Sequence, residues 1–83
     1  MLNITKLRFE RMKNELTQSK LSMISNVNLS TIRSYEQAEK SIDKASINTI
    51  IRLCYALNCE ISDILEDKKL IEMLENKRRN ENV

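Results

Sequence analysis

Residues 16–37 read LTQSKLSMISNVNLSTIRSYEQ, and this stretch decides the fold. Thr17 is a good helix N-cap, and the apolar residues Leu21 and Ile24 follow it at helical spacing, so we expect both to face the core. The helix should stop at Asn26, because asparagine is the best residue other than glycine for the left-handed conformation of a sharp turn. The first half of the stretch therefore predicts a helix of about two turns.

A second helix follows after a very short connection. Asn28 can cap it, and we expect a helix over residues 29–37 in which Ile32 and either Tyr35 or Glu36 face inward. Only Asn26 to Asn28 join the two helices, which makes a steep crossing simpler than an antiparallel return, and Val27 is an apolar plug for such a turn. This pattern is typical of a helix-turn-helix, whose second helix keeps an exposed face that projects from the domain.

Further helical patterns lie on either side of this motif. One covers about residues 3–14, with Ile4, Leu7 and Met12 expected to face inward. The strongest pattern follows the N-cap Ser46, and its apolar residues at helical spacing are Ile47, Ile50, Ile51, Cys54 and Leu57. Asn58 stands where a C-terminal glycine would be expected, and a short helix then holds Ile61, Ile64 and Leu65.

The apolar residues beyond Glu66 either extend that short helix or form another one. The chain has 83 residues, which is one small domain at most. We therefore expect an all-α domain over residues 1–66 and a C-terminal helical extension or tail over residues 67–83.

Composition argues against a membrane protein and against an acidic disordered chain. Lys and Arg number 14 against 12 Asp and Glu, for a net charge of +2, and 41% of the residues are hydrophobic. The longest apolar run, Leu53 to Leu57, is far shorter than the roughly 20 residues of a spanning helix. Residues 2–16 mix charged and apolar side chains, unlike a secretory signal. We expect no membrane contact and a cytoplasmic location.

Missing residue types argue against an enzyme. The chain has no glycine, proline or histidine, so it has no glycine-rich phosphate loop, no GxSxG elbow, no histidine base and none of the common zinc ligand sets. Cys54 and Cys59 lie five positions apart, which is not a redox or zinc spacing, and we expect two reduced thiols packed in the core. We predict no enzymatic activity, no cofactor and no metal.

The residues quoted above resemble a known family. The opening Leu16-Thr17-Gln18 and the run from Asn26 to Gln37 are similar to the XRE family, the Cro and lambda-repressor-like helix-turn-helix proteins. The resemblance continues to Leu65 and thus covers about residues 7–65. It implies a five-helix lambda-repressor-like domain that binds double-stranded DNA. The family usually has glycine where this chain has Glu15, Asn26, Ala38 and Asn58.

The resemblance also implies which residues contact DNA. In the family the second helix of the motif enters the major groove, which places the base-reading positions at Leu29, Ser30, Arg33 and Ser34. Of these, only Arg33 can make a bidentate contact with guanine O6 and N7, worth about 1–3 kcal/mol of discrimination. The candidates for phosphate contacts are Gln18, Thr31, Lys40 and Lys44. In the family, the glutamine at the position of Gln18 can also brace the reading helix.

A single domain of this kind reads about 4–6 base pairs, so two copies on a palindromic operator are expected. Candidate dimer contacts follow the last family helix at Leu70, Ile71, Met73 and Leu74, unless these residues cap the domain's own core. We expect a homodimeric transcriptional repressor that acts by promoter occlusion. The alternative is an antitoxin-like or accessory helix-turn-helix protein whose main role is to bind a protein partner.

Overall fold

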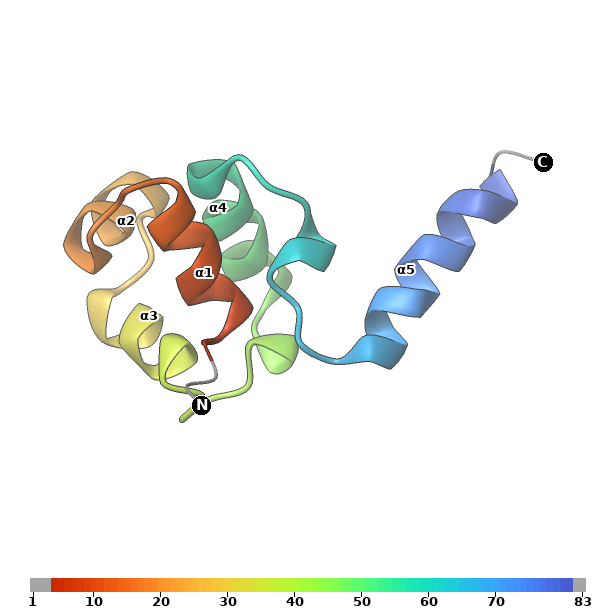
Figure 1. Cartoon of the computed structure of the whole chain (residues 1–83), viewed down its shortest axis with the longest axis horizontal. Helices are drawn as coiled ribbons and strands as arrows, with labels where there is room; N and C mark the ends of the chain where they lie inside the picture. The colour runs from red at the N-terminus through yellow and green to blue at the C-terminus, as the bar shows by residue number, and fades with distance from the viewer. Residues whose placement is uncertain (1–3, 82–83) are drawn as a thin grey trace.

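The computed structural model describes residues 4–81, with side chains described as far as residue 76. Its elements in chain order are α1 (Lys6–Lys13), α2 (Gln18–Ser25), α3 (Leu29–Glu36), the 3-10 turn η1 (Ile42–Lys44), α4 (Ile47–Leu57), the 3-10 turn η2 (Ile61–Asp63) and α5 (Lys68–Glu81). Residues 4–81 hold five α-helices and no strand, which confirms the all-α prediction. Figure 1 shows α1 to α4 gathered into one body, from which α5 extends.

Side-chain caps begin the four helices of the body. In each helix a side-chain oxygen accepts a hydrogen bond from a backbone amide of the first turn. The oxygen belongs to a hydroxyl at Thr5 (α1), Thr17 (α2) and Ser46 (α4), and to the side-chain amide of Asn28 (α3). Such a cap satisfies one of the amides that a helix start leaves without a partner. The sequence predicted the caps of α2, α3 and α4 correctly.

The helices of the body end in left-handed residues although the chain has no glycine. The backbone φ angle is 57° at Glu15, 58° at Asn26, 59° at Ala38 and 51° at Asn58. These are the four positions at which the family usually has glycine. Asparagine tolerates this conformation, whereas Glu15 and Ala38 adopt it at an expected cost of about 1–2 kcal/mol each.

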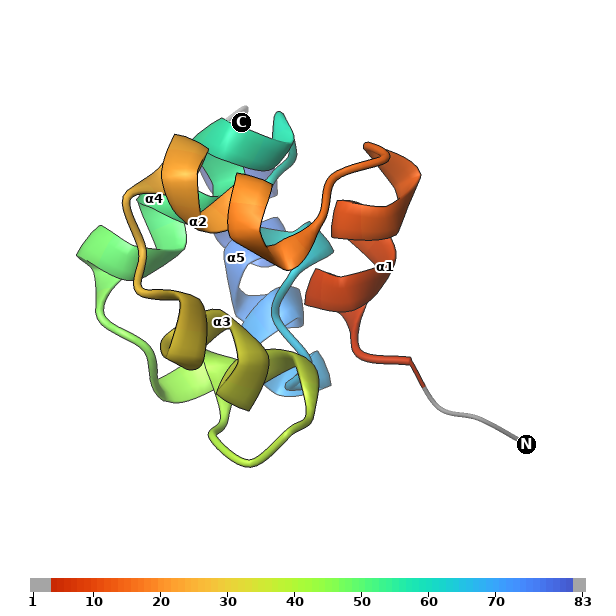
Figure 2. The ribbon, with the colours of Figure 1, turned by 90° about the vertical axis from the view of Figure 1, so that its left-hand side faces the viewer.

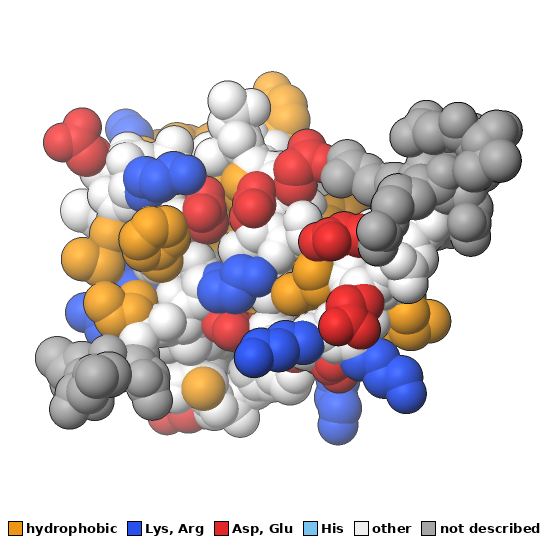
Figure 3. All heavy atoms as spheres, turned by 45° about the vertical axis from the view of Figure 1, so that its right-hand side comes forward, with side chains coloured by type: hydrophobic (Ala, Val, Ile, Leu, Met, Phe, Trp, Pro, Cys, Tyr) orange, Lys and Arg blue, Asp and Glu red, His pale blue; other side chains and the backbone are white. Residues whose placement is uncertain are grey.

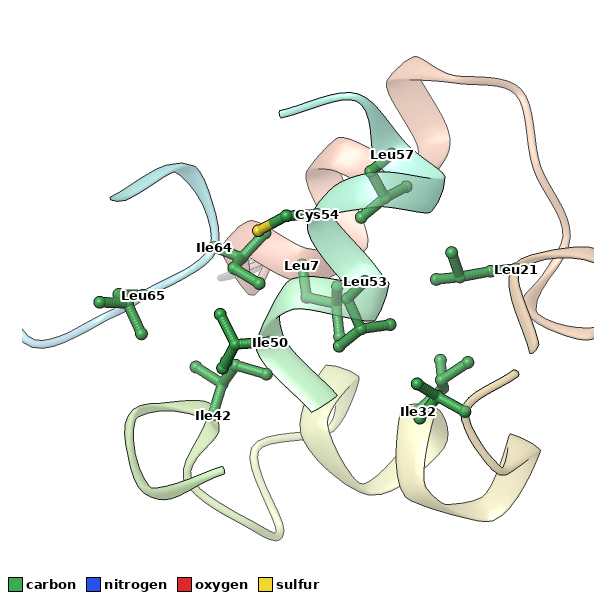
Figure 4. Close-up of a cluster of buried hydrophobic side chains, with 11 residues drawn as sticks. Leu7, Leu21, Ile32, Ile42, Ile50, Leu53, Cys54, Leu57, Ile64 and Leu65 are labelled. Atoms are coloured by element: carbon green, nitrogen blue, oxygen red, sulfur yellow. The ribbon is translucent and has the colours of Figure 1, made fainter. Parts of the chain in front are cut away.

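One hydrophobic core joins α1 to α4 with the two 3-10 turns (Figure 4). Its buried members are Leu7, Leu21, Val27, Ile32, Ile42, Ile50, Leu53, Cys54, Leu57, Ile64 and Leu65. Val27 is 7% exposed, so it plugs the turn between α2 and α3 as expected. α4 contributes four of these residues and is the central helix of the body.

Five apolar residues expected to face inward are exposed, and those expectations are wrong. They are Ile4, Met12, Ile24, Ile47 and Ile51. In α4 the core stripe runs through Ile50, Cys54 and Leu57, and it leaves Ile47 and Ile51 on the neighbouring face, 64% and 55% exposed. A helix packed on one side of a small core buries only one stripe, so a broader apolar pattern leaves some of its members in solvent.

α5 is a separate helix rather than an extension of η2. The Asp67 carboxylate caps it by accepting from the amide of Lys69 at 2.9 Å. One oxygen of Asp43, in η1, accepts from the amides of Glu66 at 2.8 Å and Asp67 at 3.0 Å, which fixes the start of α5 against the body. The division of the chain into a domain over residues 1–66 and a C-terminal extension over residues 67–83 stays a prediction.

Candidate nucleic-acid interface

The turn between α2 and α3 is closed by its own side chains. The Ser22 hydroxyl donates to the carbonyl of Val27 at 2.6 Å, and the buried Ser25 hydroxyl accepts from the amide of Val27 at 3.2 Å. Together with left-handed Asn26, these bonds set the angle between the two helices. Figure 2 shows α2 and α3 on the same side of the molecule, with α5 behind them.

A buried ion pair holds α3 against α1. Arg11 donates from Nε to Glu36 Oε2 at 2.6 Å and from Nη2 to Glu36 Oε1 at 3.0 Å. The side chain of Glu36 is only 2% exposed and that of Arg11 is 13% exposed. Arg11 also donates from Nη1 to the carbonyl of Leu16 at 2.7 Å, which ties the loop before α2 to the same group. The position of α3 therefore depends on a charge pair in which both oxygens of Glu36 accept from Arg11.

Sequence reasoning missed this pair. The helical spacing allows Tyr35 or Glu36 to face inward, but it indicates no partner for Glu36. A buried carboxylate requires a cation or several donors nearby, so an inward-facing Glu36 was a signal to search the other helices for a basic residue. Arg11 is the residue that meets this need.

The four proposed base-reading residues lie on one helix, outside the face that Ile32 and Glu36 bury. Arg33 and Ser30 are exposed, while Leu29 and Ser34 are half-buried. Arg33 donates from Nε to Gln18 Oε1 at 3.4 Å. Leu29, Ser30, Arg33 and Ser34 therefore lie on α3 outside its buried face, and their contact with bases stays a prediction.

The proposed phosphate contacts lie on three parts of the chain. Gln18 begins α2, and its amide nitrogen donates to Glu36 Oε1 at 3.1 Å, so part of its hydrogen-bonding capacity is used within the protein. Thr31 is half-buried in the first turn of α3. Lys40 and Lys44 are exposed on the segment that joins α3 to α4. The amide of Lys40 bonds the carbonyl of Ser34 at 3.3 Å, which keeps this lysine close to the end of α3.

The arrangement is a helix-turn-helix with an exposed second helix, and comparison with known families agrees. A model of the Cro/C1-type HTH DNA-binding domain matches residues 3–69. The chain belongs to this family. The match confirms the resemblance to XRE-family proteins and shows a DNA-binding domain of the regulator type. Comparison with curated proteins finds no match. The contacts assigned to individual residues stay predictions.

The cysteines are free thiols in or beside the core. Cys54 is buried and Cys59 is half-buried. Burial, followed by the neighbouring Cys54, raises the pKa of Cys59 to about 12, so this thiol stays protonated at neutral pH. Among the described residues no group of His, Cys, Asp or Glu is arranged to hold a metal. No helix within residues 4–81 is long and apolar enough to cross a membrane.

Proposed function

We propose that the protein is a sequence-specific repressor that reads its operator through α3. The observation that carries this proposal is the exposed edge of α3, where Arg33 Nε donates to Gln18 Oε1 at 3.4 Å. The ion pair of Arg11 and Glu36 anchors this helix to α1. In this arrangement Leu29, Ser30, Arg33 and Ser34 read base edges. Thr31, Lys40 and Lys44 hold phosphates, and Gln18 contributes at the start of α2.

Repression by occlusion follows from where such a domain binds. A protein seated in the major groove over a promoter excludes other proteins from the same groove. The exposed lysines on the segment after α3 supply the attraction to the phosphate backbone that does not depend on sequence. Because the proposed action is at a promoter, we infer a cytoplasmic location.

We propose further that two copies bind together, and an apolar groove beside α5 supports this. The groove encloses about 430 Å³, and its apolar lining comes from α4, α5 and the segments before and after α4: Ala45, Ile47, Ile50, Ile61, Leu65, Leu70, Met73 and Leu74. Leu70 and Ile71 pack against the core of their own chain, whereas Met73 is 59% exposed and Leu74 is 39% exposed. Met73 and Leu74 are therefore the residues we propose as contacts with a second copy.

The face of the molecule drawn in Figure 3 carries hydrophobic, acidic and basic side chains interspersed, whereas a phosphate-binding surface would be predominantly basic. In a two-fold dimer each α5 would meet the groove of the other copy, and two α3 helices would read half-sites about 34 Å apart on a palindromic operator.

Selection of bound sequences from random duplex DNA tests this function. We expect enrichment of a palindrome whose half-sites contain a guanine, and sedimentation of a 2:1 protein–duplex complex. If no sequence is enriched and the protein binds all duplexes alike, specific reading is wrong. The same groove would then be examined for the antitoxin-like alternative, in which a defined partner co-purifies with the chain at fixed stoichiometry.

A further inference from the structure

Two hydrogen bonds join Asn28 and Ser30 at the start of α3. Asn28 Oδ1 accepts from the backbone amide of Ser30 at 2.9 Å, and the same oxygen accepts from the Ser30 hydroxyl at 2.7 Å. The first bond is the N-cap of the helix, and the second joins the two side chains. Both residues are exposed, so the Ser30 hydroxyl is open to a ligand that approaches α3.

The bond between the two side chains determines where the hydroxyl proton of Ser30 points. The amide oxygen of an asparagine only accepts hydrogen bonds, so the hydroxyl must be the donor. The orientation of the Asn28 amide is itself fixed, because the reversed amide would place its NH2 group against the backbone N–H of Ser30. A length of 2.7 Å is typical of a well-formed O–H···O bond. The one hydroxyl proton is therefore engaged within the protein, and the lone pairs of Ser30 Oγ remain for a ligand.

This polarity determines which bases suit Ser30. A free serine hydroxyl can donate or accept, so by itself it does not distinguish one kind of base from another. In the major groove adenine and cytosine each present an amino group, where guanine and thymine present a carbonyl oxygen. With its proton on Asn28, Ser30 accepts from an amino group. A carbonyl oxygen would face a second acceptor unless the hydroxyl first gave up its bond to Asn28.

We infer that Ser30 reads an amino base, adenine or cytosine, and that Asn28 is the positioning residue that gives Ser30 this preference. The inference rests on the proposed function, and the family match over residues 3–69 independently indicates DNA as the ligand. From the sequence Asn28 is expected only as a helix cap, so its role in specificity is additional. Each half-site should then contain an amino base besides the guanine expected for Arg33.

Base transitions in the operator test the polarity of Ser30 directly. Sites are selected from random duplex DNA with the parent and with Ser30→Ala, and the position whose preference disappears in the variant is the one that Ser30 contacts. We expect adenine or cytosine there. Exchanging adenine for guanine, or cytosine for thymine, replaces the amino group by a carbonyl oxygen on the same strand. The parent should bind this transition duplex about fivefold more weakly per half-site, the size of one hydrogen bond, and Ser30→Ala should bind both duplexes equally.

Substitutions of Asn28 test its positioning role. Glycine is an acceptable N-cap, so Asn28→Gly should keep α3 but release the Ser30 hydroxyl, and the ratio of the two affinities should fall toward unity. Asn28→Asp keeps an acceptor oxygen, so it should retain the ratio although its charge weakens binding to both duplexes. Ser46→Gly is the matched control, because Ser46 caps α4 rather than α3; it should lower stability and leave the ratio unchanged.

The outcomes separate this inference from the proposed function. If the parent enriches no sequence at all, the proposed function is wrong and the inference fails with it. If a sequence is enriched but Ser30→Ala changes no base preference, or the affected position holds guanine or thymine, the inference is overturned while reading by Arg33 stands. A folded Asn28→Gly variant with the parent ratio would refute the role of Asn28. Circular dichroism checks folding, and the Ser30→Ala experiment decides the inference if Asn28→Gly does not fold.

Discussion

Ala38 offers a sharp test of how this chain ends its helices without glycine. It lies just after α3 with φ at 59°, and the amide of Glu39 bonds the carbonyl of Ser34 at 2.9 Å, as in a Schellman motif. Glycine adopts this conformation without the clash of a Cβ atom. We therefore expect Ala38→Gly to stabilise the protein.

The size of the effect follows from two opposing terms. Relief of the left-handed conformation contributes about 1–2 kcal/mol. The greater freedom of glycine in the unfolded chain removes about 0.5–1 kcal/mol of that gain. The midpoints of the two ranges leave a net increase in the free energy of unfolding of about 0.75 kcal/mol, which raises Tm by about 3–6 °C in a domain of this size.

The same substitution elsewhere in the chain provides the control. Ala56 lies inside α4, where glycine costs about 1 kcal/mol relative to alanine, so Ala56→Gly should lower Tm by about 4–8 °C. Thermal melts followed by circular dichroism measure both variants. If Ala38→Gly lowers Tm as Ala56→Gly does, Ala38 is not left-handed in solution and our account of the α3 terminus is wrong.

Three further predictions concern the ion pair, the DNA contacts and the dimer. Glu36→Ala should destabilise the protein by about 3–5 kcal/mol in denaturant unfolding, because it leaves a poorly hydrated guanidinium without its partner; a loss below about 1 kcal/mol would contradict this. Arg33→Ala should lose about 1–3 kcal/mol of binding free energy per half-site on the selected operator, with little change in the dependence of affinity on salt concentration. Lys44→Ala should weaken binding to all duplexes and reduce the slope of log affinity against log salt concentration by about 1 per phosphate contact. Met73→Glu combined with Leu74→Glu should give a folded monomer by sedimentation, since both residues are exposed in the single chain; an unchanged dimer would place the interface elsewhere.

Local signals in the sequence predicted much of the fold. The caps at Thr17, Asn28 and Ser46 are properties of a few neighbouring residues, and so are the left-handed stops at Asn26 and Asn58. Such signals do not depend on what the rest of the chain does. For this reason the sequence alone predicts the turn and both helices of the motif.

Features that depend on distant segments were not predictable in the same way. The pairing of Glu36 with Arg11 joins residues 25 positions apart, and helical spacing carries no information about it. Exposure of Ile47 and Ile51 depends on where α5 and η2 lie around α4, which the pattern of α4 alone does not determine. The α3 face was predictable because burial of Ile32 on one side leaves the other side exposed.

Asp43 has a geometric consequence for the proposed dimer. One of its carboxylate oxygens accepts hydrogen bonds from the backbone amides of Glu66 and Asp67. Because Asp43 lies in the segment between α3 and α4, this segment determines the direction in which α5 leaves the body. A change of a few degrees at this joint would be multiplied along the 14 residues of α5. In a dimer joined through α5, that angle sets the separation of the two α3 helices and hence the number of base pairs between half-sites. Variation at Asp43 would therefore retune operator spacing while leaving every base-reading residue unchanged.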